Sequence, residues 1–209
     1  MRCQDRRLRT ALVALLLAFV VGASPVAPAA IPLSIEDPDL VARLRDEKMV
    51  VTERREPVSD AGPSFIGYVV FDRPVDRVFE LLRETSRQGE FRPDLDRVES
   101  VEHDPDGSLD EHHARYSFFD LVYRLRYRFE AEERRISWRL DPEFENALRR
   151  VEGRWELEPW GPAQTLARFE TSIEVGAALP RVLENAIVRR SVPATLEGCR
   201  RWVNADGDR

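Results

Sequence analysis

The sequence predicts an α+β protein in which an antiparallel sheet has one apolar face and a long C-terminal helix covers that face. The first observation is residues 121–130, where aromatic and aliphatic side chains alternate with charged ones, as in a half-buried strand. The second is that three later segments repeat this alternation, and the third is that the chain then ends in one long helical stretch. Much of the apolar face is aromatic. The sequence therefore predicts a hydrophobic interior more clearly than any catalytic group.

The start of the chain has the pattern of an export signal. An arginine-rich beginning is followed by the 13-residue apolar run from Ala11 to Ala23, and then by small residues that suit cleavage after Ala23 or Ala29. A helix needs roughly 18 to 20 apolar residues to span a bilayer. We therefore expect residues 1–29 to be a signal peptide and the protein to be exported, to the periplasm or outside the cell, with an N-terminal membrane anchor as the alternative.

Residues 30–63 are expected to form an N-terminal segment that joins the main domain. Asp37 is placed to cap a short helix, residues 49–53 read as a first strand, and residues 56–63 read as a loop. Residues 64–71 then form a strand rich in Phe, Ile, Tyr and Val.

Two short helices follow this strand. Asp72-Arg73-Pro74 ends it and begins a helix over 75–83, whose buried residues are Val78, Phe79, Leu81 and Leu82. A helical turn over 86–91 ends at Arg92-Pro93, because the residue before a proline disfavours helix.

The second half of the chain predicts an antiparallel meander. A weakly alternating strand over 98–103 leads to a turn at Pro105-Asp106-Gly107, and the strands of the meander then fall at residues 111–118, 121–132, 135–140, 148–158 and 166–175. Short connections require antiparallel pairing, since a parallel pair needs a crossover of about a dozen residues or more. The polar register mixes Arg and Glu on neighbouring strands, which predicts a solvated, charge-paired face.

Leu179-Pro180 opens the last helix, which is expected to run to about Trp202. Pro193 should kink it. Leu183, Ile187, Ala194 and Trp202 lie roughly on one side of this helix, and residues 204–209 are expected to be a disordered tail.

Several of these segments resemble the START-like (SRPBCC, helix-grip) superfamily. The run from Phe71 to Leu82 looks like the family's opening strand, proline and helix, and Phe91-Arg92-Pro93 resembles its aromatic-x-proline motif. The resemblance covers about residues 64–202, within an expected domain of 64–203, and is nearest to the polyketide cyclase and coenzyme-Q-binding branch. It implies a curved antiparallel sheet of about six to seven strands wrapped around the last helix, with an apolar cavity that takes a lipid, quinone, sterol or polyketide.

The predicted cavity residues combine the aromatic register of the strands with positions that the resemblance adds. Aromatic stripes in strands are more often plain core, so the same residues also fit a filled interior. The candidates are Phe91, Tyr116, Phe118, Tyr123, Leu125, Tyr127, Trp138, Trp155, Phe169, Ile173, Leu183 and Ile187.

Catalytic and metal-binding patterns are weak. His112 and His113 are adjacent on a strand and point to opposite faces, so they do not share a metal easily, and they read, with His103, as polar or surface histidines. Asp120 is expected to lie in a hairpin turn and to make turn hydrogen bonds, and Glu143 and Glu145 are expected to be solvated. We therefore assign no catalytic residue, no metal and no cofactor.

Charge argues against nucleic acid as a partner. After the expected leader the chain has 28 basic and 37 acidic residues, a net charge of −9. Arg124, Arg126 and Arg128 form a row, but the aromatics between them face the other way. Cys199, alone after the leader, reads as a small buried apolar group.

The leading hypothesis is an exported, non-enzymatic protein that binds or carries a hydrophobic small molecule. The last helix and the segment Phe91-Arg92-Pro93, called the Phe91 segment below, would gate the cavity. A cyclase or hydrolase of the polyketide-cyclase type is the first alternative, and it needs an inward polar pair such as His112 with Tyr123. The second alternative is a cell-envelope interaction module that docks a protein through its last helix or through residues 37–55.

Overall fold

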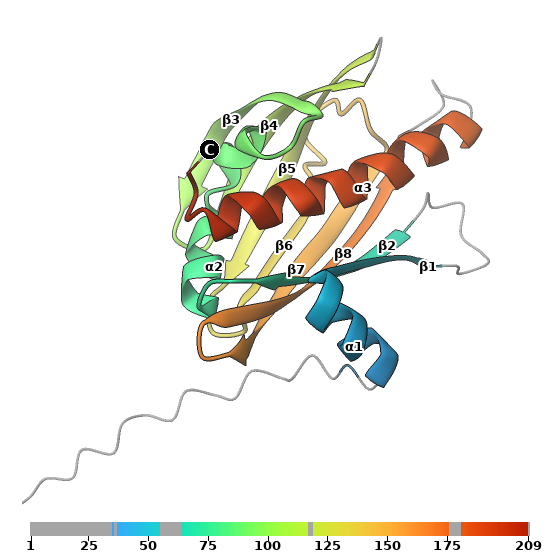
Figure 1. Cartoon of the computed structure of the whole chain (residues 1–209). Helices are drawn as coiled ribbons and strands as arrows, with labels where there is room; N and C mark the ends of the chain where they lie inside the picture. Colours follow the sequence, from blue (N-terminus) through green and yellow to red (C-terminus); the bar gives the residue numbers. More distant parts are fainter. Residues whose placement is uncertain (1–34, 36, 55–63, 117–118, 176–180, 209) are drawn as a thin grey trace, which may run out of the picture.

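A computed structural model of the chain describes residues 35, 37–54, 64–116, 119–175 and 181–208 (Figure 1). For residues 116, 119 and 181–188 it describes the backbone only. The expected signal peptide, the 56–63 loop and the side chains of Tyr116, Phe118, Leu183 and Ile187 therefore lie outside the described part. Among the described residues, no helix is long and apolar enough to cross a membrane.

The sheet has eight antiparallel strands in the order β1-β2-β8-β7-β6-β5-β4-β3. The strands are β1 (Met49–Arg54), β2 (Ser64–Phe71), β3 (Leu95–Asp104), β4 (Gly107–Tyr116), β5 (Phe119–Glu130), β6 (Arg135–Leu140), β7 (Arg150–Gly161) and β8 (Gln164–Glu174). The predicted class and antiparallel pairing are correct, and all eight segments read as strands belong to this sheet. The six to seven strands that the resemblance implied are too few. The N-terminal strand β1 belongs to the same sheet as the meander.

Four helical elements complete the fold: α1 (Pro38–Glu47), α2 (Val75–Arg83), the 3-10 helix η1 (Thr85–Glu90) and α3 (Arg181–Asn204). The α2 and η1 elements connect β2 to β3, which lie near opposite edges of the sheet. The last helix α3 crosses the concave face, as the sequence predicted (Figure 1). It runs unbroken through Pro193 to Asn204.

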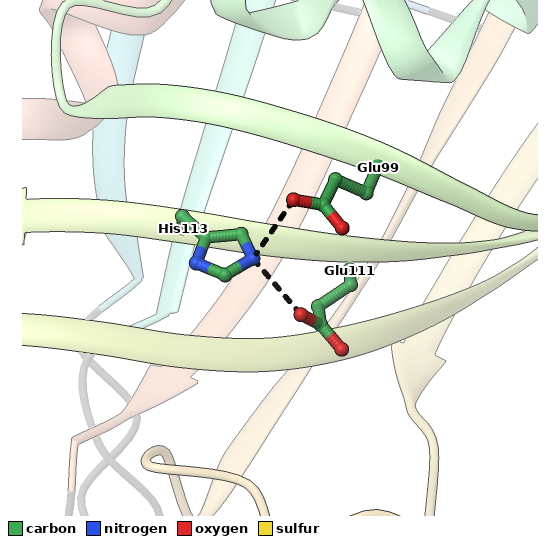
Figure 2. A group of neighbouring side chains, drawn as sticks. All are labelled: Glu99, Glu111 and His113. Carbon is green, nitrogen blue, oxygen red and sulfur yellow. Dashed lines mark hydrogen bonds and ion pairs between the residues drawn. The ribbon is translucent and has the colours of Figure 1, made fainter.

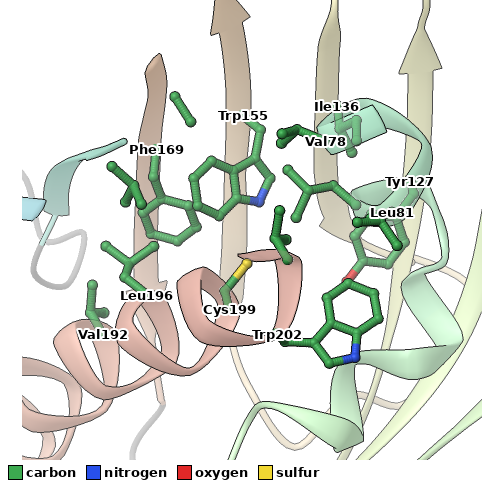
Figure 3. Packing of buried hydrophobic residues seen from close by; sticks show 14 of the residues in the cluster. Val78, Leu81, Tyr127, Ile136, Trp155, Phe169, Val192, Leu196, Cys199 and Trp202 are labelled. Atoms are coloured by element: carbon green, nitrogen blue, oxygen red, sulfur yellow. The ribbon is translucent and has the colours of Figure 1, made fainter. Parts of the chain in front are cut away.

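The main core lies between the sheet and α3. Inner-register strand residues such as Phe71, Phe129, Ile136 and Leu157 are buried there, together with Leu196 and Val203 of α3. Figure 3 shows Val192, Leu196 and Cys199 of α3 beside Trp155 and Phe169 of the strands. Full burial of one such side chain contributes roughly 1.5 to 3 kcal/mol, so this layer holds α3 on the sheet.

The helix α1 covers the other face of the sheet, over β1, β2 and β8. Leu44, Val50, Val70 and Leu166 form a separate buried cluster there. Asp37 caps the helix by accepting hydrogen bonds from the backbone N–H groups of Asp39 and Leu40. The N-terminal segment is therefore part of the fold, on the side away from α3.

The arginine register of β5 lies on the outer face and is charge-paired, as predicted. Arg124 pairs with Glu111 at 3.0 Å, Arg126 with Glu102 at 3.2 Å, and Arg128 with Glu130 at 3.5 Å.

The expected disordered tail does not match residues 204–208. Asp206 pairs with Arg77 of α2 at 2.7 Å, and the backbone oxygen of Gly207 accepts a hydrogen bond from Arg87 of η1 at 2.6 Å. These contacts could not be predicted from the polar composition of the tail. They form because α3 ends beside α2 and η1.

Candidate ligand-binding cavity

The inner face of the sheet and α3 enclose a cavity of about 110 Å³. Its wall comes from α2 and η1, from the inner register of β5 to β8, and from α3. The strand residues among its lining are Leu121, Tyr123, Leu125, Tyr127, Ile136, Trp138, Val151, Trp155, Phe169, Thr171 and Ile173. The strict alternation of the strands places these side chains on one face. The predicted hydrophobic interior is therefore not completely filled by side chains.

Eight of the twelve predicted cavity residues line this space. They are Phe91, Tyr123, Leu125, Tyr127, Trp138, Trp155, Phe169 and Ile173. The other four, Tyr116, Phe118, Leu183 and Ile187, have side chains outside the described part of the structure. That these residues contact a ligand remains a prediction.

The aromatic residues form one packed wall. The ring of Phe169 lies 4.7 Å from that of Trp155 and 5.5 Å from that of Trp138, measured between centroids, and Trp138 lies 6.3 Å from Tyr127. Gly153, directly opposite Trp138 on β7, makes room for the indole, because a Cβ at Gly153 would come within 2.4 Å of the Trp138 ring. The wall is thus a rigid apolar surface with few polar atoms.

One end of the cavity is polar. Gln88 of η1 and the nearby Arg92 line it beside Tyr123 and Tyr127. The amide nitrogen of Gln88 lies 2.9 Å from the Tyr127 hydroxyl, and Arg92 donates to the Gln88 oxygen at 3.3 Å. Arg92 is itself paired with Asp94 at 2.7 Å. This end can therefore offer hydrogen bonds without a net charge from the Arg92–Asp94 pair.

His112 lies directly behind this polar end, which corrects the expectation of a polar or surface histidine. Its side chain is fully buried and stacks on Tyr123, its cross-strand partner, with ring centroids 5.1 Å apart. Burial lowers the pKa of His112 well below its ordinary value, and the nearby Arg92 adds to this effect. His112 is therefore neutral, and it supports the tyrosines from outside the cavity wall.

A second buried polar group sits farther along β4. Asp110 is fully buried and accepts hydrogen bonds from Thr85 of η1 and from Ser108, the latter at 3.0 Å. Burial raises the pKa of the Asp110 carboxyl above its ordinary value, and these hydrogen bonds act in the opposite direction. Ser108, Asp110 and His112 occupy alternate positions of β4, so the inner face of this strand is polar beneath η1.

The Phe91 segment lines the cavity and packs against α3. Gly198 of α3 is packed on the backbone of Phe91, where an added Cβ would lie 2.2 Å from the Phe91 oxygen. Next to it, the indole of Trp202 donates to Glu90 at 3.0 Å, and its ring lies 5.2 Å from the Phe91 ring. The predicted gate therefore consists of two elements in close contact.

Cys199 lines the cavity as a buried thiol, as expected for a small apolar group. Burial raises the pKa of its thiol well above the ordinary value, so the reactive thiolate form is suppressed.

Figure 2 shows the second histidine of the pair, His113, on the outer face with Glu99 and Glu111. Its Nε2 lies 2.9 Å from Glu111 and 3.7 Å from Glu99. Arginines already pair with these carboxylates, since Arg97 is 2.6 Å from Glu99 and Arg124 is 3.0 Å from Glu111. The cluster is therefore accounted for as a surface ion-pair network, and a metal would have to displace two guanidinium groups.

The remaining polar candidates lie away from the cavity. Asp120 pairs with Arg115 across the β4–β5 hairpin at 3.0 Å. His103, Glu143 and Glu145 are exposed. The two histidines 112 and 113 do point to opposite faces, as the strand period predicted.

Sequence reasoning missed the polar end of the cavity. Gln88 lies in η1 and Arg92 directly before Pro93, where the sequence predicted only a helical turn and its end. The signal for His112 was present in the alternation of Ser108, Asp110, His112 and Ala114, which repeats at the period of a strand but with polar side chains. Polar residues in an inner register are hard to tell from a solvated face without knowing that η1 covers them.

Comparisons with known proteins agree with this fold. A family model described as polyketide cyclase / dehydrase and lipid transport matches residues 64–201. No curated protein sequence matches the chain.

Three solved structures are similar in fold. The STAR-related lipid transfer protein from Xanthomonas axonopodis has a TM-score of 0.61 at 20% identity, covering 75% of this chain and 94% of that chain. The Zhui aromatase/cyclase from a Streptomyces species has a TM-score of 0.55 at 18% identity, covering 77% and 99%. A START superfamily protein from Mycobacterium smegmatis has a TM-score of 0.56 at 13% identity, covering 75% and 97%.

These structural likenesses, at 20% identity or less, establish the helix-grip architecture and no activity. The family model, in contrast, spans most of the chain, from the start of β2 to the last turns of α3. The chain therefore belongs to the polyketide cyclase / dehydrase and lipid transport family of the START-like superfamily.

Proposed function

We propose that the protein binds or carries a hydrophobic small molecule in the cavity between its sheet and α3. The observation that carries the proposal is the cavity itself, an apolar and aromatic wall with a few convergent polar groups at one end. A cavity filled by its own side chains would have favoured an interaction module, but about 110 Å³ is left open here. The family description, which includes lipid transport, supports the same function.

The cavity volume sets what fits without movement. An engineered cavity of roughly 150 Å³ binds benzene, and drug-sized ligands occupy roughly 300 to 1,000 Å³. The 110 Å³ described here therefore suits a ligand about the size of one ring or smaller. A lipid, quinone or polyketide requires the Phe91 segment or α3 to move outward.

Native mass spectrometry of the purified protein, followed by organic extraction, tests the proposal. The matched variants are Val192→Phe, which fills the cavity from α3, and Arg190→Phe, which adds the same ring at an exposed position of that helix. We expect a hydrophobic molecule bound to the wild type and to Arg190→Phe, and little or none bound to Val192→Phe. An empty wild-type protein that also excludes apolar dyes contradicts the proposal.

A second candidate function is a cyclase-type reaction, favoured by one observation. Tyr123 lines the cavity, stacks on the neutral His112 and lies within hydrogen-bonding reach of Arg92. Such a group can hold a carbonyl oxygen during an aldol condensation, which forms a carbon–carbon bond and releases water. The test is incubation with a linear poly-β-ketone. A product lighter by one water, lost in Tyr123→Phe, supports the reaction, and an unchanged substrate contradicts it.

We further propose that the protein is exported. The support is the arginine-rich start followed by the short apolar run and small residues before Ile31. Mass analysis of protein from the periplasm and the culture medium is expected to show a chain cut after Ala23 or Ala29. An intact chain that stays in the cytoplasm contradicts export.

A further inference from the structure

The polar end of the cavity contains a chain of hydrogen bonds. The direction of each bond follows from Arg92, whose side chain can only donate. Asp94 holds Arg92 through two contacts, at 2.7 and 3.3 Å, and Arg92 donates to the side-chain oxygen of Gln88. Because a guanidinium has no acceptor, Gln88 must turn its oxygen to Arg92 and its NH₂ group to Tyr127. The Gln88 amide therefore donates to the Tyr127 oxygen, 2.9 Å away.

The second neighbour of the Tyr127 hydroxyl is His112, whose Nε2 lies 3.3 Å away. Neutral imidazole carries one hydrogen, on either Nδ1 or Nε2. The Nδ1 of His112 is buried, and no described residue forms a hydrogen bond with it. A buried N–H without an acceptor is rarer in proteins than a buried acceptor without a donor. The hydrogen therefore belongs on Nε2, from which it points to the Tyr127 oxygen.

Both lone pairs of the Tyr127 oxygen are then engaged, and only its own hydrogen is free. Tyr127 is buried and lines the cavity. We propose that Tyr127 determines ligand specificity by donating a hydrogen bond to a carbonyl oxygen of an otherwise apolar ligand. This inference rests on the proposed function, because it places a ligand in the same cavity.

The charge of this end narrows the ligand further. Asp94 neutralises Arg92 through their two contacts, and both side chains are largely buried. A carboxylate bound here would find Arg92 already paired and would carry the desolvation cost of an unpaired charge, and Glu84 in the same cavity lining adds a like charge. The polar end therefore selects a neutral ketone or aldehyde oxygen over an acid, and it disfavours a plain hydrocarbon.

Two probes of the same shape test this selection. Acetophenone and α-methylstyrene differ only in the replacement of the carbonyl oxygen by a CH₂ group. Each is one ring with a three-atom substituent, so both require the same small outward adjustment of the cavity wall. The binding of both is measured by NMR titration against the wild type, Tyr127→Phe and Tyr68→Phe. Tyr68 is the matched control, since it packs in the α1 cluster on the other face of the sheet.

We expect Tyr127→Phe to weaken acetophenone binding about three- to tenfold, as for loss of one neutral hydrogen bond, and to change α-methylstyrene binding less than about twofold. Tyr68→Phe should alter neither. Equal effects on both probes, or no effect on either, overturn the role of Tyr127 and leave cavity binding intact. If neither probe binds the wild type, cavity binding itself fails, and this inference fails with it.

A second measurement uses the wild type alone and so does not depend on the variant folding. Nitrogen–proton correlation spectra of the histidine rings identify which nitrogen of His112 carries the hydrogen. Hydrogen on Nε2 supports the inference. Hydrogen on Nδ1 overturns it, because Tyr127 would then spend its own hydrogen on His112.

Discussion

At the scale of single residues, His112 shows how burial changes the role that a sequence pattern suggests. A histidine in a short alternating segment ordinarily faces solvent, yet this one is sealed between Tyr123, Tyr127 and the polar end of the cavity. Its pKa is lowered by burial, so the folded protein holds it neutral. The unfolded chain has no such environment, and this difference links stability to pH.

The linkage gives a prediction for the free energy of unfolding. Below the ordinary histidine pKa of about 6.5, the unfolded chain takes up a proton at His112 that the folded protein does not. The contribution of His112 to the free energy of unfolding is therefore fully present above about pH 6.5. Below that pH the contribution falls by up to about 1.4 kcal/mol per pH unit. Urea denaturation from pH 8 to pH 5.5 should show wild-type stability falling relative to His112→Phe.

The control for this experiment is His103→Gln, which removes an exposed histidine of β3. It should follow the wild-type pH dependence. A constant difference between the wild type and His112→Phe across this range would show that His112 is protonated equally in both states.

Gly198 gives a second prediction at this scale. A methyl group there would collide with the backbone of Phe91, so Gly198→Ala must push the Phe91 segment away from α3. We expect a loss of about 1 to 3 kcal/mol in the free energy of unfolding, typical of overpacking. Gly89→Ala is the control, since its nearest contact would be 4.0 Å, and it should change stability by no more than about 1 kcal/mol. Equal effects of the two variants would contradict the close packing of the Phe91 segment on α3.

At the scale of elements, strands and helices differ in how far the sequence predicted them. The alternation in β5, β7 and β8 predicted their inner and outer faces, because one face of each is apolar and the other is charged. The inner face of β4 was not predicted, since Ser108, Asp110 and His112 are polar and only the covering η1 makes them internal. The turn that carries Gln88 and Arg92 depends equally on a tertiary neighbour. A local sequence pattern shows which residues share one face of a strand. It does not show whether another element covers that face.

The element α1 provides a test of whether the N-terminal segment stabilises the domain. Leu44 is fully buried against β1, β2 and β8, on the face opposite the cavity. Leu44→Ala should lower the free energy of unfolding by about 2 to 4 kcal/mol, without changing the affinity for a cavity probe. Arg43→Ala, which breaks only the exposed pair with Glu47, should leave the free energy of unfolding almost unchanged. Loss of probe binding in Leu44→Ala, at a temperature where it is folded, would contradict the separation of the two faces.

At the scale of the whole molecule, the sheet separates two environments. Its outer face carries paired arginines and carboxylates, and its inner face, with α3, encloses an apolar space with one polar end. The family resemblance predicted this division, and the alternating strands predicted which residues take each side. The size of the space was beyond the sequence, because it depends on how closely α3 and the Phe91 segment pack on the sheet.

The four tryptophans allow the central claim, that the inner cavity takes an apolar ligand, to be tested in one NMR titration with α-methylstyrene. Trp138 and Trp155 line the cavity, whereas Trp160 packs in the α1 cluster on the other face. We predict that the indole N–H signals of Trp138 and Trp155 shift with a saturable dependence on the probe, and that the signal of Trp160 does not. Unchanged cavity signals, or a shift confined to Trp160, would contradict the account.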